Sequence, residues 1–125
     1  IELKKHGYKV VCFSGVYNRA TIPAQNVFVY DAQFANIFHF KNGELTGLLG
    51  GEVMFSDSKG KMLKRLQSLL NVTEEDTLTV GDGANDLSMF QYAGKRAAFC
   101  AKPVLKEKAN IIIENKDLTE LLNFI

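Results

Sequence analysis

The chain has 125 residues, of which 46% are hydrophobic, and its 15 basic and 14 acidic residues give a formal net charge of +1. This length is typical of one domain, and the even charge balance excludes the strongly basic surfaces that bind nucleic acid or anionic membranes. No apolar run approaches the roughly 20 residues that a membrane-spanning helix needs. We therefore expect a globular cytoplasmic domain, with Cys12 and Cys100 as buried thiols rather than a disulfide.

The first residues read as the last turns of a helix that ends at Gly7. Because a domain rarely starts within a helix, we expect these 125 residues to be the later part of a longer protein. Residues 8–13 are strand-like, and this strand is predicted to end at Ser14 and Gly15. By position a helix should follow at residues 18–30, although Pro23 fits it poorly.

Residues 33–40 and 45–49 are two strand-like runs separated by an Asn42-Gly43 turn, which predicts a β-hairpin. The residues from Gly50 to Asp57 are expected to form an irregular link. An amphipathic helix is predicted from Ser58 onward. Its apolar stripe is expected to be Met62, Leu63, Leu66, Leu69 and Leu70, with Lys64, Arg65 and Gln67 facing outward.

The most informative segment is residues 79–86, Thr-Val-Gly-Asp-Gly-Ala-Asn-Asp. A short β-branched strand at residues 77–80 breaks into glycines, so the carboxylates of Asp82 and Asp86 emerge together at the end of a strand. Mg²⁺ prefers one or two carboxylates together with water and substrate phosphate. The alternative is an acidic turn that caps the next helix, with Asp86 as an ordinary N-terminal charge.

The remaining pattern alternates helices at residues 87–92, 104–109 and 118–124 with strands at 96–101 and 111–113. Such alternation predicts an α/β fold, a mostly parallel sheet with helices on both faces, together with the hairpin. Ligands of parallel sheets bind at the carboxyl ends of the strands. Ser14, Gly15 and the Asp82–Asp86 segment are therefore expected at one edge, and Lys59 could reach it.

Each of these residues has an ordinary interpretation when it stands alone. Ser14-Gly15 is a common strand-end turn, Lys59 is one lysine among many, and Asn85 is a good helix cap. Together they supply a hydroxyl, backbone N–H groups, an ammonium and two carboxylates, which is the equipment that holds a phosphoryl group with Mg²⁺.

These residues resemble the haloacid dehalogenase superfamily and, within it, the phosphoserine phosphatases. The resemblance extends over essentially the whole chain. It is carried by Phe13-Ser14-Gly15, Phe34-Ala35-Asn36, the hairpin at 42–47, Ser58-Lys59-Gly60-Lys61, residues 80–89 and Ala98-Phe99-Cys100-Ala101-Lys102-Pro103.

The resemblance implies a role for each candidate residue. Ser14 and the Gly15 amide would bind phosphate oxygens, and Lys59 would neutralise the charge of the nucleophile and phosphoryl group. Asp82 would bind Mg²⁺, with Asp86 as its outer-shell partner at the metal, and Asn85 would contact the substrate. The implied reaction is Mg²⁺-dependent hydrolysis of a small phosphorylated metabolite, most simply phosphoserine in serine biosynthesis, through an aspartyl-phosphate.

The chain also departs from the family pattern. The Asp-x-Asp-x-Thr/Val motif of the family's central first strand, which carries the nucleophile, does not occur in residues 1–125, and neither does the helical cap that selects the substrate. Val16 and Tyr17 stand where the family usually has glycine and phenylalanine. We expect the chain alone to be inactive, and to recruit a strand from a missing N-terminal half or a strand-swapped copy of itself.

Two other interpretations stay open. The chain could be a non-catalytic remnant that binds phosphate or a partner protein. Alternatively, it could belong to a phosphatase of the same subfamily that acts on another small phosphomonoester.

Overall fold

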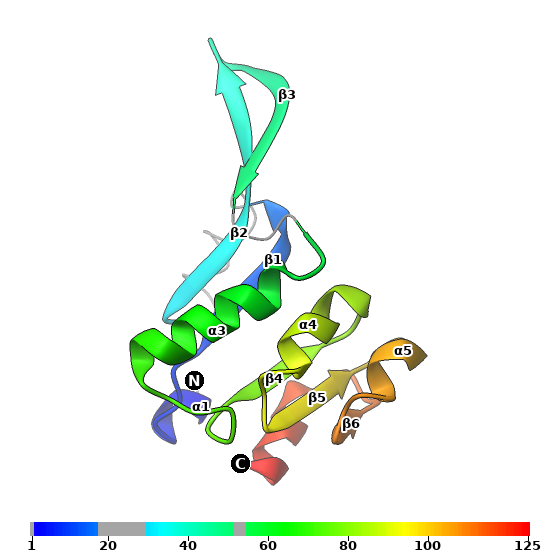
Figure 1. Ribbon diagram of the computed structural model, residues 1–125. Coiled ribbons are helices and arrows are strands. Elements are labelled where there is room, and N and C mark those ends of the chain that lie inside the picture. The colour runs from blue at the N-terminus through cyan, green and yellow to red at the C-terminus, as the bar shows by residue number, and fades with distance from the viewer. Residues whose placement is uncertain (1, 18–29, 52–54) are drawn as a thin grey trace. The chain divides into compact units, whose positions relative to one another are not determined.

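The computed structural model describes residues 2–17, 30–51 and 55–125 of the chain, which folds as two compact units. The first unit is Ile1–Phe55 and the second is Ser56–Ile125. The first unit has a short helix followed by three strands, and in the second unit strands alternate with helical segments (Figure 1), so the predicted α/β class is confirmed. Within the described ranges, no helix has the length and apolar character needed to cross a bilayer.

The first unit begins with the short helix α1 (Glu2–Lys5), followed by β1 (Val11–Tyr17), β2 (Ala32–Lys41) and β3 (Glu44–Gly51). Gly7 ends the helix as predicted: its φ is 85° and its N–H donates to Lys4 O at 3.0 Å. A positive φ costs glycine little, which is why it suits the end of a helix.

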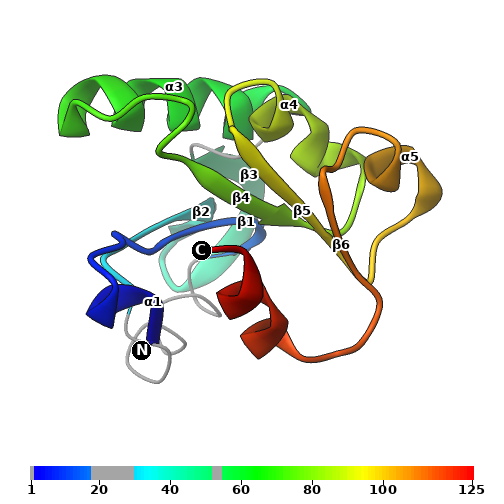
Figure 2. The same ribbon diagram turned by 90° about the horizontal axis from the view of Figure 1, so that it is seen from below.

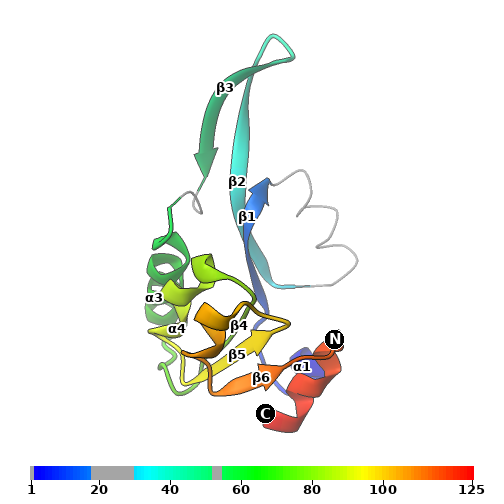
Figure 3. The same ribbon diagram turned by 90° about the vertical axis from the view of Figure 1, so that its right-hand side faces the viewer.

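The hairpin was predicted correctly. β2 and β3 are antiparallel, and Lys41 faces Glu44 across a two-residue turn. Both turn residues have positive φ, 52° at Asn42 and 80° at Gly43, as the Asn-Gly pair favours. β1 pairs in parallel with the first half of β2, and the hairpin is the continuation of β2 with β3 (Figure 3).

The predicted bounds of two segments in this unit were wrong. β1 starts at Val11 and continues through Ser14 and Gly15 to Tyr17, so the chain does not leave the sheet at the serine. Gly50 and Gly51, expected in an irregular link, belong to β3. The helix predicted at residues 18–30 falls almost entirely outside the described residues.

The second unit contains a parallel three-stranded sheet in the order β4-β5-β6. Its elements are α3 (Ser58–Leu70), β4 (Leu78–Gly81), the 3₁₀ turn η1 (Ala84–Asp86), α4 (Leu87–Phe90), β5 (Lys95–Phe99), α5 (Pro103–Lys106), β6 (Ile111–Ile113) and the 3₁₀ helix η2 (Leu118–Phe124). The long helix from Ser58 and the three short strands follow the prediction closely.

Both faces of this sheet are covered. Helices α3, α4 and α5 lie on one face and η2 lies on the other (Figure 2). Successive residues of β5 point to opposite faces, so Ala98 packs with Phe90 and Leu105, while Ala97 packs with Ile113 and Leu121. Each side of the strand therefore has its own apolar core.

The inner face of α3 differs from the predicted stripe. Met62 and Leu63 are buried, but Leu69 and Leu70 are 78% and 47% exposed. Gln67, predicted to face outward, is buried because its Nε2 donates to Thr77 Oγ1 at 2.9 Å and to Tyr92 O at 2.7 Å. Two hydrogen bonds compensate the burial of this amide, which hydrophobic periodicity cannot reveal.

Cys100 also differs from its predicted place in a buried strand. β5 ends at Phe99, and Cys100 has a φ of 44° where the chain turns away from the sheet. Its side chain is exposed, with Sγ donating to Glu114 O at 3.4 Å. Cys12 is half-buried, and neither cysteine forms a disulfide.

Candidate functional site

The loop after β4 is built around the carboxylate of Asp86. Its Oδ2 atom accepts hydrogen bonds from the amides of Asp82 and Gly83, at 2.9 and 3.2 Å. Gly81 makes room for this carboxylate, because a Cβ atom there would lie only 2.5 Å from Asp86 Cβ. The Gly-Asp-Gly sequence therefore closes into a tight turn with an almost fully buried acid inside it.

Lys59 reaches the other oxygen of the same carboxylate. Its Nζ lies 2.6 Å from Asp86 Oδ1, and the two side chains are only 8% and 5% exposed. A charge with so little access to water is tolerated where an opposite charge and hydrogen bonds compensate it. Of the three N–H donors of the ammonium, one is used by Asp86 among the described residues, which leaves donors for a ligand.

The first turn of α3 brings Lys59 to this position. Ser58, Lys59 and Gly60 are all buried, and Gly60 packs against the backbone of Ser88 in α4. Its N–H donates to Ser88 Oγ at 3.0 Å. The start of the lysine-bearing helix is thus attached directly to the segment that follows Asp86.

Asp82 differs from Asp86 in the exposure of its side chain and in the partners of its carboxylate. Its side chain is exposed, and its carboxylate has no hydrogen-bond or ion-pair partner within residues 2–17, 30–51 and 55–125. Its backbone is fixed, since its N–H donates to Asp86 and its carbonyl accepts from Lys102 N–H at 3.0 Å. A free carboxylate on a fixed backbone is a suitable cation ligand.

The described residues do not contain a complete metal centre. No group of three or more His, Cys, Asp or Glu side chains lies close enough together, in this part of the chain, to hold a metal ion. Asp86 has both oxygens occupied, one by Lys59 and the other by two amides. The arrangement therefore offers one free carboxylate and one that is held by its neighbours.

Asn85 lies exposed in η1, one residue before Asp86. Its Oδ1 atom would lie 3.3 Å from a Cβ atom placed on Gly83, so its amide stands over the glycine of the turn. A substrate contact by Asn85 stays a prediction.

Ser14 and Gly15 belong to the first unit. The parallel pairing of β1 with β2 is regular from Val11 to Phe13 and then shifts, since Tyr17 faces Asn36 only two residues after Phe34. Ser14 and Gly15 lie within this irregular stretch, where a strand departs from regular hydrogen bonding. Lys59, Asp82 and Asp86 are brought together by the second unit, whereas the participation of Ser14 and Gly15 stays a prediction.

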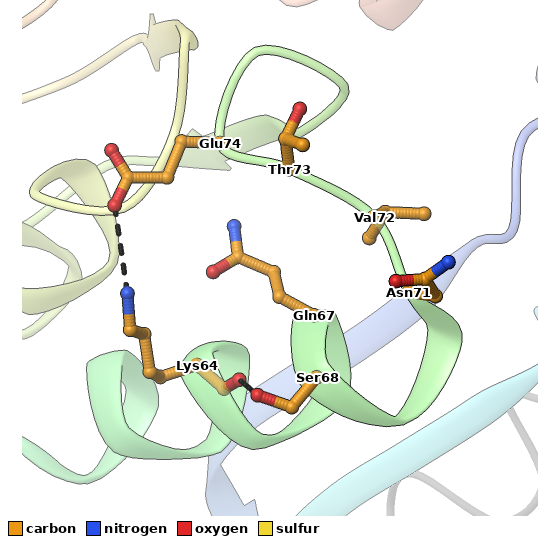
Figure 4. A pocket seen from close by; sticks show the side chains of 7 residues that line it. All are labelled: Lys64, Gln67, Ser68, Asn71, Val72, Thr73 and Glu74. Carbon is orange, nitrogen blue, oxygen red and sulfur yellow. Dashed lines mark hydrogen bonds and ion pairs between the residues drawn. The ribbon is translucent and has the colours of Figure 1, made fainter.

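A separate hollow of about 290 Å³ lies at the opposite end of α3 (Figure 4). It is lined by Lys64, Gln67, Ser68, Asn71, Val72, Thr73 and Glu74. Its lysine is paired with Glu74 at 3.7 Å, and Nζ lies 5.0 Å from the ring centre of Tyr92. This hollow shares no residue with the cluster at the carboxyl end of β4.

Gly60 and Ser88 received no individual role from the sequence pattern, although the geometry of the cluster depends on both. A signal was present at Gly60, because a glycine in the first turn of a helix costs stability relative to alanine unless another group approaches closely. Nothing in the sequence pattern distinguishes Ser88 from an ordinary helical serine.

Comparison with known families and relatives shows which proteins this chain is similar to. A family model for haloacid dehalogenase-like hydrolases matches residues 51–125. A phosphoserine phosphatase of Wolinella succinogenes is 59% identical over 121 residues, covering 97% of this chain and 59% of the relative. That of Methanocaldococcus jannaschii is 47% identical over 124 residues, covering 99% and 59%. The chain thus spans 59% of the length of these curated relatives.

Solved structures of phosphoserine phosphatases are also similar to this chain. A phosphoserine phosphatase in its apo form has a TM-score of 0.94 and 47% identity, covering 99% of this chain and 62% of the other. A substrate-bound complex has a TM-score of 0.93 at the same identity, covering 99% of this chain and 59% of the other. A structure described as a phospho-aspartyl intermediate analogue of phosphoserine phosphatase has the same TM-score of 0.93, the same identity of 47% and the same coverage.

Proposed function

Because this chain belongs to the haloacid dehalogenase-like hydrolase family, we propose that it forms the phosphoryl-binding part of a phosphoserine phosphatase. The observation that carries the proposal is the buried Lys59–Asp86 pair beside the free carboxylate of Asp82. These groups surround the turn after a parallel strand, which is where ligands of such sheets bind. The curated relatives reported above, which match nearly all of this chain, are phosphoserine phosphatases.

The proposed reaction has two displacements at phosphorus. An aspartate carboxylate attacks the phosphomonoester, the bond from phosphorus to the serine oxygen breaks, and that oxygen takes a proton. Water then attacks the aspartyl-phosphate, which releases inorganic phosphate and restores the carboxylate. Residues 1–125 contain no Asp-x-Asp-x-Thr/Val sequence, so the proposed nucleophile lies on sequence outside them, and these residues form the C-terminal portion of the core domain.

Lys59 is the residue of this chain that acts most directly on the phosphoryl group in the proposed reaction. Its ammonium is fixed by Asp86, so its remaining N–H donors are already oriented when charge develops on the phosphoryl oxygens. Groups oriented in advance need no reorganisation, and losing one well-placed donor typically costs about 3–4 kcal/mol of barrier stabilisation. The Ser14 hydroxyl and Gly15 N–H are proposed to bind the same oxygens.

Mg²⁺ is the proposed cofactor, and the donor set fits it in part. Asp82 offers a free carboxylate, and Mg²⁺ takes one or two carboxylates with water and phosphate as its other ligands. Both carboxylate oxygens of Asp86 already accept hydrogen bonds, from Lys59 and two amides, so it would act behind Asp82 by fixing the loop. When bound, the ion would neutralise charge on the phosphoryl oxygens.

The test is Mg²⁺-dependent release of phosphate from L-phosphoserine. We expect no turnover by the 125-residue chain alone, and turnover once a family segment with the Asp-x-Asp-x-Thr/Val strand and cap is joined to it. Asp82→Asn should abolish that turnover, whereas Asp76→Asn, an exposed acid in the connector before β4, should not. Turnover by the chain alone that Asp82→Asn removes would contradict the proposed location of the nucleophile.

Substrate choice is tested with the joined protein and a panel of small phosphomonoesters. A higher kcat/KM for L-phosphoserine than for every other member supports the proposed substrate. A clear preference for another member would keep the phosphatase chemistry and replace the substrate. Binding of phosphate without any turnover would favour the non-catalytic interpretation.

A further inference from the structure

The first backbone amides of α3 have no acceptor within the helix, and one of them, that of Gly60, donates to a side chain of another helix. The first intrahelical bond runs from Lys61 N–H to Asp57 O at 3.1 Å, so the amides of Ser58, Lys59 and Gly60 need acceptors from elsewhere. Asp57 is in the N-cap position, but its side chain makes no capping hydrogen bond. The acceptor for Gly60 is the Ser88 hydroxyl, 28 residues away in α4.

The close approach of the two helices depends on Gly60 having no side chain. A Cβ atom at this position would lie 2.4 Å from the carbonyl oxygen of Ser88 and 2.9 Å from its Cβ. Both distances are shorter than any normal contact, and the first involves backbone, which cannot rotate away. The glycine therefore lets the helix start pack directly on Ser88.

Two links now join the same two segments. Lys59 is bound to Asp86, and the next residue, Gly60, is bound to Ser88, two residues beyond Asp86. The ion pair alone would leave the lysine free to pivot with the first turn of its helix. The second link fixes that turn, so the direction from which the ammonium approaches is fixed too.

We propose that Ser88 is a positioning residue, which acts through Gly60 to hold the Lys59 ammonium in the orientation that phosphoryl transfer requires. This inference rests on the proposed function. Ser88 does not touch the reacting atoms in this mechanism. Its contribution is to the placement of Lys59, and small displacements of a charged group reduce its stabilisation of the reaction.

The experiment compares Ser88→Ala and Ser88→Thr in the joined, active protein. We expect Ser88→Ala to lower kcat for L-phosphoserine about tenfold, with a smaller change in KM, because Lys59 acts on charge that develops during the reaction. Ser88→Thr keeps the hydroxyl and should retain most of the rate. The matched control is Ser68→Ala, whose hydroxyl donates within α3 to Lys64 O and should leave the rate unchanged.

A double-mutant cycle separates positioning from a general effect on stability. In a Lys59→Ala background, Ser88→Ala should change kcat by less than about twofold, because the group that it positions is gone. Hydrogen exchange of the Gly60 amide should accelerate in Ser88→Ala and not in Ser68→Ala. If Ser88→Ala does not fold, Ser88→Cys, which keeps the shape with a weaker acceptor, replaces it in the same cycle.

The experiment distinguishes failure of this inference from failure of the proposed function. Equal effects of Ser88→Ala in both backgrounds, or an unchanged kcat despite faster exchange at Gly60, would overturn the inference and leave the proposed function intact. If the joined wild-type protein hydrolyses no phosphomonoester, the proposed function fails and this role of Ser88 fails with it.

Discussion

At the residue scale, the carboxylate of Asp86 holds the site together through three hydrogen bonds, and its side chain is only 5% exposed. Replacing it with asparagine puts an amide opposite the buried ammonium of Lys59, which loses its counter-charge. Breaking one side of a buried ion pair is strongly destabilising. We expect Asp86→Asn to lower the free energy of unfolding by about 3 kcal/mol or more, measured by urea unfolding.

The matched control for Asp86 is the exposed pair of Asp57 with Lys61, whose side chains are 55% and 73% exposed. Exposed pairs contribute about 0–1 kcal/mol. Asp57→Asn should therefore have a small effect. Equal losses in the two variants would show that the burial of the Lys59–Asp86 pair does not matter for stability.

For Asp82 we expect substitution to have a small effect on stability and a large effect on activity. Its side chain is exposed and unpartnered within the described ranges, so no folded-state contact is lost when it is changed. We expect Asp82→Asn to change the free energy of unfolding by less than about 0.5 kcal/mol, while it abolishes the Mg²⁺-dependent turnover of the joined protein. A large loss of stability would mean that the carboxylate has a structural role in the loop.

At the scale of elements, helix propensity and packing have opposite effects on a substitution at Gly60. In an exposed helix interior, glycine to alanine typically stabilises by about 0.5–1 kcal/mol. At Gly60 the new methyl would meet the Ser88 carbonyl at 2.4 Å, and overpacking costs about 1–3 kcal/mol. We expect Gly60→Ala to lower the thermal midpoint, and Ser68→Ala on the same helix to leave it nearly unchanged. A higher midpoint in Gly60→Ala would show that the helices separate easily.

The start of η2 makes stability depend on pH. The Thr119 hydroxyl and then the Thr119 amide, both donating to the carboxylate, lower the pKa of Asp117 from its ordinary value of 3.8. A lowered folded-state pKa stabilises the fold above the unfolded-state value and loses this effect as the pH falls through the folded one. The thermal midpoint of Asp117→Ala should therefore lie below that of wild type at pH 7.

The difference in thermal midpoint between Asp117→Ala and wild type should narrow below pH 4, because Asp117 takes up a proton in the folded chain. Asn123→Ala, which changes an exposed side chain of η2 that carries no ionisable group, should show no such narrowing. A constant difference between Asp117→Ala and wild type over the whole range would assign the loss to packing instead of the charged cap.

Several elements could be predicted because local chemistry determines them. Asn42-Gly43 supplies the two positive φ angles of its turn, and the run from Ser58 has the period of an amphipathic helix. The approach of Lys59 to the Asp82–Asp86 loop followed from strand topology. The burial of Gln67 depends on partners in the β4 connector and after α4, which are distant in sequence, so hydrophobic periodicity could not reveal it. The attachment of Gly60 to Ser88 is non-local for the same reason.

At the scale of the whole molecule, the strands in the described part of the chain form two three-stranded sheets. β1 is an edge strand of one sheet and β4 is an edge strand of the other, each with one neighbour among the described strands. Edge strands expose unpaired N–H and C=O groups, which favour pairing with another strand. Val80 in β4 is also 36% exposed.

Adding a segment with the Asp-x-Asp-x-Thr/Val strand should therefore protect specific amides from hydrogen exchange. We expect slower exchange for the amides of β4 that point away from β5 and for those of β1 that point away from β2, because they gain carbonyl partners. The outer amides of β6, at the other edge of the second sheet, provide the internal control and should not change. Without the segment, we expect the chain to associate with itself as its concentration rises. A strictly monomeric chain that unfolds cooperatively, with β4 amides already protected, would mean that no further strand is required.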